Sequence, residues 1–158
     1  MKLSTRAKYG IHAMLDLAQR RGAGPQSIKL IAERQGIPEQ YLEQLIALLR
    51  REGLVSSVRG AQGGYLLTKP PGEITMAKLM HVLEGPISLS NCLEDEDCCD
   101  RSFVCSARRV WERLSNSIDQ VLHSVTLEDM LEDHMRLQAE RIGEPERVGE
   151  SKRMEESQ

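Results

Sequence analysis

The stretch IAERQGIPEQYLEQLIALL, residues 31–49, decides the fold of this chain. Ala32 is small enough to let two helices cross closely, and Gly36, four residues later, supplies a turn. Pro38 suits the first position of a new helix, because an N–H there would lack a partner anyway. Ile37 and the apolar positions after it pin this second helix against the first. The pattern predicts a helix-turn-helix, an arrangement that many DNA-binding proteins use.

Helices are expected on both sides of the turn. One runs from Ser4 to about Arg20 and ends at a Gly-Pro-rich break, and a short one runs from Ser27 to Gln35. The helix that begins at Pro38 stops at Gly53. Its buried face is expected to consist of Leu42, Leu45, Ile46 and Leu49.

A β-hairpin is expected directly after this helix, with strands at residues 54–58 and 65–68 and a glycine-rich tip between them. In that position a hairpin is the wing of a winged helix. Arg59 and Gly60 lie at the base of the tip, and a small cationic loop can enter a minor groove. The alternative is an ordinary hairpin with a loose loop.

The third helix offers a polar face that could read bases. Gln40 and Gln44 can pair with adenine, Glu43 can accept from the amino group of cytosine, and Tyr41 lies between them. The alternative for Glu43 is a surface ion pair with Arg50 or Arg51. Phosphate contacts are expected from a subset of the basic residues Lys2, Arg6, Lys8, Lys29, Arg50, Arg51 and Arg59.

Charge is distributed unevenly along the chain. Residues 1–72 contain 11 Lys or Arg against 5 Asp or Glu, whereas residues 73–158 contain 10 against 19. A basic first half on a protein of net charge −3 indicates a local surface for a polyanion. A solvated charged face is the alternative.

Composition excludes several classes of protein. Aromatic residues make up 3% of the chain, which argues against an all-β fold. We find no apolar stretch long enough for a membrane span and no signal-peptide core, so a cytoplasmic protein without membrane contact is expected. The chain also lacks a nucleophile–base or Gly-rich cofactor motif, so it is not expected to be an enzyme.

All four cysteines, Cys92, Cys98, Cys99 and Cys105, fall within fourteen residues. So tight a cluster in a cytoplasmic chain favours a metal site over a disulfide framework. Two gaps of five residues suit zinc poorly, and an iron–sulfur cluster can span more widely spaced thiolates. Zinc and a thiol switch at the vicinal pair Cys98-Cys99 are the alternatives.

A long helix follows the cysteines. Its apolar positions are spaced 3, 4, 3, 4, 3, 4, which lays a seam along one side: Val104, Ala107, Trp111, Leu114, Ile118, Val121 and Val125. Pairing with the same helix of a second subunit is the favoured interpretation, and burial within one subunit is the alternative. Thr126 is expected to cap another short helix.

The expected fold is mainly α with a small β-wing, in four segments. These are a winged helix-turn-helix DNA-binding domain (1–85), a cysteine cluster-binding loop (86–105), a dimerisation helix with a following short helix (106–135), and a polar, disordered tail (136–158).

Up to about residue 135 the chain resembles the IscR-type winged-helix transcription regulators of the Rrf-two family. The resemblance rests on five stretches and on the cysteine loop that runs into Trp111. The stretches are MKLS (1–4), Tyr9 with AMLDLA (13–18), YLEQL (41–45), GLVSSVRG (53–60) and GGYLL (63–67).

The resemblance implies a homodimer that binds imperfect palindromes in promoters, with an iron–sulfur cluster tuning its affinity for double-stranded DNA. It also supports Tyr41, Glu43 and Gln44 as base-reading residues and Arg59-Gly60 as the minor-groove wing. The main function expected is repression of iron–sulfur biogenesis genes. A nitric-oxide- or redox-responsive regulator is the alternative within the family, and a redox protein without DNA binding is the alternative outside it.

The chain departs from the family pattern in two places. The family has three cysteines with two five-residue gaps, and here an extra residue makes Cys99 the favoured middle ligand between Cys92 and Cys105, with Cys98 as the substitute. The family's histidine, three residues after the third cysteine, is replaced by Arg108, which cannot deprotonate to bind iron. His12, on the first helix, is the best remaining candidate for the fourth ligand. The cluster type, 2Fe–2S or 4Fe–4S, stays open.

Overall fold

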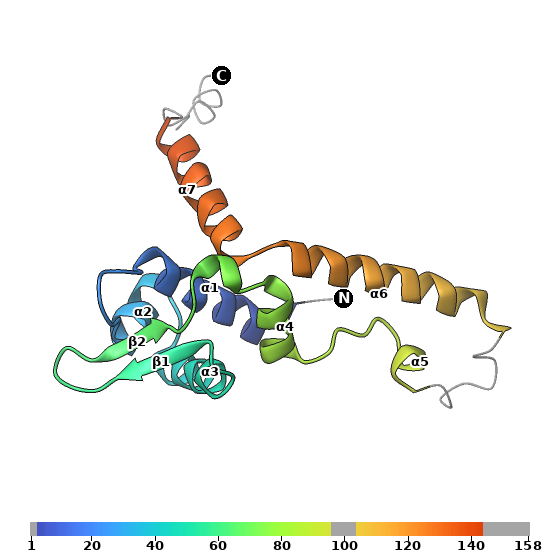
Figure 1. Ribbon diagram of the computed structural model, residues 1–158, viewed down its shortest axis with the longest axis horizontal. Coiled ribbons are helices and arrows are strands. Elements are labelled where there is room, and N and C mark those ends of the chain that lie inside the picture. The colour runs from blue at the N-terminus through green and yellow to red at the C-terminus, as the bar shows by residue number, and fades with distance from the viewer. Residues whose placement is uncertain (1–2, 96–103, 144–158) are drawn as a thin grey trace, which may run out of the picture.

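The computed structural model describes residues 3–95 and 104–143 of the chain. Figure 1 shows a helical body with a two-stranded hairpin at one edge and two helices, α6 and α7, that project from it in different directions. The fold is mainly α-helical with a small β-wing, as the sequence predicts.

Three helices form the predicted helix-turn-helix unit. They are α1 (Thr5–Gln19), α2 (Ile28–Gln35) and α3 (Glu39–Arg51). The side chain of Ser4 accepts a hydrogen bond from the backbone of Ala7 and so caps α1, and Ser27 caps α2 in the same way.

The turn between α2 and α3 follows from two residues. Gly36 ends α2 with a φ of +62°, a left-handed conformation that glycine adopts without steric cost. Pro38 lies one position before the first residue of α3, so it occupies the N-cap and not the first helical position that the sequence suggested. Its extended ψ of 127° explains the difference, because the chain turns into the helix only at Glu39.

The core lies where α1 crosses α2, α3 and α4 (Met76–Glu84). All four apolar positions expected on the inner face of α3 are buried. Gly10 lets α1 and α4 approach closely, because a Cβ at this position would lie 2.5 Å from the Cδ2 atom of Leu83. The packing therefore fixes the orientation of α3 relative to the rest of the body.

The wing consists of β1 (Val55–Val58) and β2 (Gly64–Leu67), paired antiparallel with Val55 opposite Leu67 and Val58 opposite Gly64. Its base is held by a further pair of backbone hydrogen bonds between Gln26 and Tyr65, of 3.0 and 2.8 Å. A Cβ on Gly64 would lie 2.4 Å from the carbonyl oxygen of Gln26, so this contact requires glycine.

The segment after the wing contains a short 3-10 turn (Pro71–Glu73), α4, and α5 (Asn91–Glu94). The sequence predicted a cysteine loop from residue 86 to 105, and the structure forms the short helix α5 within it. This one-turn helix is preceded by Ser90 in extended conformation.

Two helices end the described chain. The first, α6 (Ser106–Ser124), corresponds to the predicted long helix, and it packs against α4 and α5. The second, α7 (Leu127–Gly143), returns to α1, with Leu127 fully buried. Thr126 caps it as expected. The hydroxyl and the N–H of Thr126 donate to Asp129, which lowers the pKa of that carboxyl.

The second of these helices is longer than the short helix that the sequence predicted, and it continues into the segment expected to be disordered from residue 136. Side-chain pairs along the helix, such as Arg136 with Asp133 at 2.6 Å, support it locally. The rest of the expected tail, from residue 144, lies outside the described residues. None of the described helices is long and apolar enough to cross a membrane.

Candidate DNA-binding surface and cysteine loop

The polar face of α3 lies in solvent. Gln40, Glu43 and Gln44 are exposed, and Tyr41 is half-buried. The ring of Tyr41 lies edge-on to the ring of Tyr9 on α1, with centroids 6.0 Å apart and planes at 74°. This contact limits the directions in which the Tyr41 hydroxyl can point.

The structure does not form the ion pair suggested as the alternative role of Glu43. Arg51 pairs instead with Glu52 at 3.8 Å, and Arg50 donates to the hydroxyl of Ser57 at 3.4 Å. Among the described ion pairs none involves Glu43, so its carboxylate is available on the surface of α3.

The other expected DNA-contacting residues are also exposed. Lys29 lies on α2, and Arg59 and Gly60 lie at the wing tip. Gly60 has a φ of +120° and its carbonyl accepts from the N–H of Gly63 at 2.9 Å, so a tight glycine turn forms the tip. The helix α3 and the wing follow each other directly, and the hairpin lies beside α3 in Figure 1.

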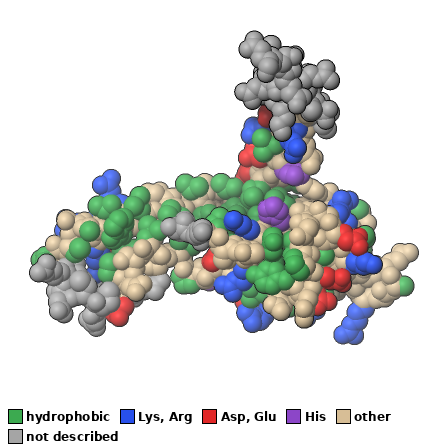
Figure 2. Space-filling model, turned by 180° about the vertical axis from the view of Figure 1, so that it is seen from behind, with side chains coloured by type: hydrophobic (Ala, Val, Ile, Leu, Met, Phe, Trp, Pro, Cys, Tyr) green, Lys and Arg blue, Asp and Glu red, His purple; other side chains and the backbone are tan. Residues whose placement is uncertain are grey.

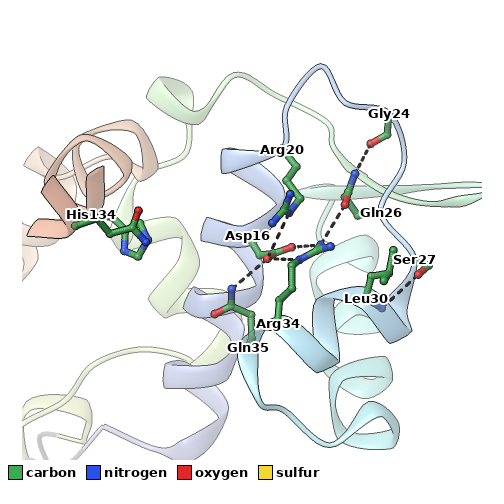
Figure 3. A network of polar contacts seen from close by, with 10 residues as sticks. Asp16, Arg20, Gly24, Gln26, Ser27, Leu30, Arg34, Gln35 and His134 are labelled. Atoms are coloured by element: carbon green, nitrogen blue, oxygen red, sulfur yellow. Dashed lines mark hydrogen bonds and ion pairs between the residues drawn. The ribbon is translucent and has the colours of Figure 1, made fainter. Parts of the chain in front are cut away.

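A polar network that the sequence did not predict joins α1, α2 and the wing (Figure 3). At its centre Asp16 is 1% exposed and accepts two hydrogen bonds from Arg34, of 2.8 and 2.5 Å, and one from Gln35, of 3.1 Å. This pairing with Asp16 raises the pKa of Arg34, so the guanidinium stays charged. Such a two-pronged pair fixes geometry as well as charge.

The network continues to the wing. A guanidinium nitrogen of Arg34 donates to the side-chain oxygen of Gln26 at 3.1 Å, and the backbone of Gln26 pairs with Tyr65 of β2. The helix-turn-helix and the base of the wing are thus held by one set of contacts. The signal in the sequence was an aspartate among the buried residues of α1, which requires a charged partner elsewhere.

The structure describes the two outer cysteines of the loop. Cys92 lies in α5, half-buried, with its Sγ atom 3.2 Å from the hydroxyl of Ser90. Cys105 is also half-buried and occupies the N-cap of α6 without a side-chain capping bond. The helix α5, which contains Cys92, packs against α6, which begins directly after Cys105. Cys98 and Cys99 lie outside the described residues.

The candidate fourth ligand, His12, and Arg108, which replaces the family's histidine, both lie in the described part of the chain. His12 is exposed on α1, and Arg108 pairs with Glu112 on α6 at 3.1 Å. Within residues 3–95 and 104–143 no three metal-binding side chains come together, and the expected middle ligand lies outside these ranges.

A scan against protein families matches residues 3–133 to the Rrf2 model, described as an iron-dependent transcriptional regulator. The chain is 45% identical over 130 residues to the HTH-type transcriptional regulator CymR of Bacillus subtilis, covering 82% of this chain and 89% of CymR. It is 39% identical over 131 residues to the regulator IscR of Photorhabdus laumondii, covering 83% and 79%.

Solved structures agree with these matches. The IscR of T. potens superposes with a TM-score of 0.71 at 46% identity, covering 92% of this chain and 93% of that one. CymR of B. subtilis, described as its global cysteine regulator, superposes with a TM-score of 0.72 at 42% identity, covering 84% and 97%. From the family match, these relatives and the winged-helix fold, the chain belongs to the Rrf2 (Rrf-two) family of DNA-binding transcription regulators, which are not enzymes.

Proposed function

We propose that this protein is a homodimeric, cytoplasmic repressor whose affinity for palindromic operators is set by an iron–sulfur cluster in the cysteine loop. The observation that carries the proposal is the position of this loop. It connects α5, which follows the winged body in the chain, to α6, the helix with the apolar seam. Because family membership fixes DNA binding, the alternative of a redox protein without DNA binding is set aside.

In this proposal α3 lies in the major groove. Gln40, Tyr41, Glu43 and Gln44 face the base edges, Lys29 contacts a phosphate, and the wing tip with Arg59 and Gly60 enters the adjacent minor groove. The exposure of these side chains and the tight glycine turn at the tip support the assignment.

Glu43 is expected to discriminate between operators more than it contributes affinity. Its carboxylate is repelled by phosphates and gains only where it accepts from a cytosine amino group. Replacing Glu43 by Ala should reduce the preference for cytosine at one position of each half-site by about 1–3 kcal/mol, which is roughly 5- to 150-fold in relative affinity. Competition binding with operators that differ at single base pairs measures this. An unchanged profile of base preference would contradict the role.

The residues proposed to hold the cluster are Cys92, Cys99 and Cys105, with Cys98 as the substitute for Cys99 and His12 as the candidate fourth ligand. Two observations support this choice of ligands. The Ser90 hydroxyl lies within hydrogen-bonding distance of the Cys92 sulfur, and Cys105 is half-buried at the N-cap of α6 without a side-chain capping bond. When bound, an iron–sulfur cluster supplies redox and ligand-exchange chemistry. Arg108, engaged with Glu112, has no ligand role.

The chain can couple the loop to DNA binding through α5 and α6. The helix α5 packs on α6, and α6 packs on α4 of the winged body. A loop that differs between its ligand-bound and free forms would therefore change how α6 lies against the body. In a dimer joined through α6 this changes the separation of the two recognition helices. Only such a difference between the two states can shift operator affinity.

The experiment that tests the cluster is anaerobic purification with visible absorption and iron and sulfide assays. Wild-type protein is expected to show iron-dependent bands, which Cys92→Ala, Cys99→Ala and Cys105→Ala should abolish. Cys98→Ala removes the neighbouring thiol and is the matched control; it should keep the bands, because Cys99 and not Cys98 is the proposed middle ligand. Loss of the bands in His12→Ala would support His12 as the fourth ligand.

Two results would count against a cluster. Wild-type protein that stays colourless and iron-free after anaerobic reconstitution would contradict the cluster. Stoichiometric zinc in that protein would favour a structural zinc site instead.

A thiol-based regulator of cysteine metabolism is the second candidate. The similarity to CymR, the global cysteine regulator of B. subtilis, favours it, and so does the vicinal pair Cys98-Cys99. If the protein is iron-free and its operator affinity changes reversibly with a thiol oxidant, the thiol-based regulator would be supported over the iron–sulfur regulator.

A further inference from the structure

A polar pocket lies at the joint between the winged body and the projecting helix α6 (Figure 1). It is formed by α4, by the segment that leaves α4 at Gly85, and by the second half of α6. Its volume is about 310 Å³. This volume is at the lower end of the range for small-molecule sites in proteins. The pocket belongs neither to the polar face of α3 nor to the cysteine ligand set, so neither of those sites accounts for it.

Polar side chains line this pocket from both sides. His81 comes from α4, and Ser115, Asn116 and Asp119 come from α6. Within the part of the chain that the structure describes, the side chains of His81, Ser115 and Asn116 make no hydrogen bond. The two walls of the pocket therefore present polar groups that do not bond to each other and that a third molecule can bridge.

Ser115 behaves differently from two other serines of the same helix. The hydroxyls of Ser117 and Ser124 donate to backbone carbonyls of α6, each at 2.9 Å, as helical serines commonly do. Ser115 is half-buried on the side of α6 that faces the body, and it makes no such bond. A half-buried hydroxyl costs free energy unless water or a ligand bonds to it. Its hydroxyl is thus available to a molecule in the pocket.

The charges of the lining residues indicate the class of ligand. Asp119 is the one acidic residue that lines the pocket, and no lysine or arginine lines it. The carboxylate of Asp119 pairs with His123 on the surface of α6 through its Oδ2 atom at 3.3 Å, so its other oxygen can accept from an ammonium group. His81 and Asn116 carry N–H groups that can donate to a carboxylate.

The remaining wall of the pocket is apolar. Ile87 comes from the segment after α4, and Ile118 and Leu122 come from α6, all three half-buried. A ligand that matches this lining carries an ammonium group, a carboxylate and a short apolar side chain. These are the groups of an aliphatic α-amino acid.

We propose that the pocket binds a small apolar amino acid, with its ammonium group on Asp119 and its carboxylate on His81 and Asn116. The Ser115 hydroxyl bonds to the ligand, and the apolar wall receives its side chain. Because the ligand contacts α4 and α6 together, it fixes the angle between the winged body and α6. The resulting effect on operator affinity rests on the proposed dimer joined through α6, whereas binding of the ligand needs only the pocket.

The first test is calorimetry on the full-length protein with L-valine, L-leucine and L-methionine as probes. At least one should bind saturably, at one site per chain, with a Kd of about 1 mM or tighter, the range for ligands of so few atoms. The N-acetyl form of that probe lacks the ammonium group, and the corresponding amine lacks the carboxylate. Both should bind about tenfold more weakly or worse. No saturable binding of the three probes, or equal binding of the N-acetyl form, would overturn the proposal.

The second test assigns the residues. Asp119→Asn should weaken binding of the probe by about tenfold or more, because a charged hydrogen bond is lost, and Ser115→Ala should weaken it by about threefold. Asp133→Asn removes the same charge from an exposed position of α7 and is the matched control, with an unchanged Kd. Circular dichroism shows that each variant is folded. An Asp119→Asn protein that binds the probe as tightly as Asp133→Asn does would reject the site.

The third test measures operator affinity with and without the bound amino acid. Wild-type protein is compared with the triple variant Cys92→Ala/Cys99→Ala/Cys105→Ala. The ligand should change operator affinity by about fivefold or more, and by the same factor in both proteins, because its contacts do not involve the cysteines. An unchanged affinity in both would refute the effect on α6. Failure of the proposed cluster is distinguishable, because an iron-free protein should still bind the amino acid in the calorimeter.

Discussion

Replacing Leu114 by Asp should convert the protein to a monomer and weaken operator binding by about 100-fold or more, because two half-sites are then no longer bound as one unit. Leu114 is 45% exposed, beside Trp111 at 40% and Val121 at 61%, and α6 has no buried residue. In Figure 2 hydrophobic side chains gather along this projecting arm. So long an apolar strip is unusual on a monomer and is typical of an interface.

In the proposed function, the partner of this strip is a second copy of the chain. The 3, 4 spacing of the seam is the pattern by which two helices pack side by side. An aspartate placed within the interface would have to lose its hydration without a partner, which opposes association far more than it disturbs an exposed monomeric helix.

The control for this prediction is Gln120→Asp. Gln120 is exposed on the same helix but outside the seam, so this variant carries the same new charge and the same loss of helix propensity. Sedimentation equilibrium gives the mass, and binding to full operators and half-sites gives the affinities. Dimeric Leu114→Asp with wild-type affinity would show that the seam has another role.

The helix-turn-helix could be predicted because its determinants are local. Gly36 adopts the left-handed conformation that ends α2, Ser4 and Ser27 cap their helices through their own side chains, and the apolar period of α3 matches its buried face. Each of these features depends on residues a few positions apart, which is why one sequence is enough to recognise them.

Features that depend on distant pairs were not predicted. The edge-on contact of Tyr9 with Tyr41 joins α1 to α3, and a cleft beside α3 is lined by arginines that lie 44 and 45 residues apart in the chain (Arg6 with Arg50 and Arg51). The extent of α7 was underestimated for a different reason. Its outer part has no buried face, and side-chain pairs and helix propensity give a weaker periodic signal than burial does.

The candidate sites also differ in whether they depend on local sequence or on segments that meet in space. The reading residues of α3 and the wing could be proposed, because a recognition helix and its wing have fixed places in the order of the chain. The ligand set of the cysteine loop could not be completed. An extra residue between Cys92 and Cys105 allows either Cys98 or Cys99, and the fourth ligand depends on which segments meet the loop in space.

Replacing Asp16 by Ala should reduce the free energy of unfolding by about 3 kcal/mol, the lower end of the range for breaking a buried charge pair. Asp16 is 1% exposed and Arg34 25% exposed, so Arg34 would lose its partner while solvent compensates in part. For a chain of this size the loss corresponds to a decrease in Tm of roughly 10 °C. Urea unfolding followed by circular dichroism gives the free energy of unfolding, and thermal unfolding followed by the same signal gives the Tm.

Two further variants show that the effect comes from the network and not from losing any carboxylate. Asp119→Ala removes an aspartate that is 69% exposed and pairs with His123 on the surface of α6, and it should cost less than about 1 kcal/mol. The double variant Asp16→Ala/Arg34→Ala should lose clearly less stability than the sum of the losses of the two single variants. Once either residue is removed, the other has no partner left to lose. Strict additivity, or equal losses for Asp16→Ala and Asp119→Ala, would mean that the pair does not hold α1 to α2. Because the same guanidinium holds Gln26 at the base of the wing, the Asp16 variant should also weaken operator binding at temperatures where it is still folded.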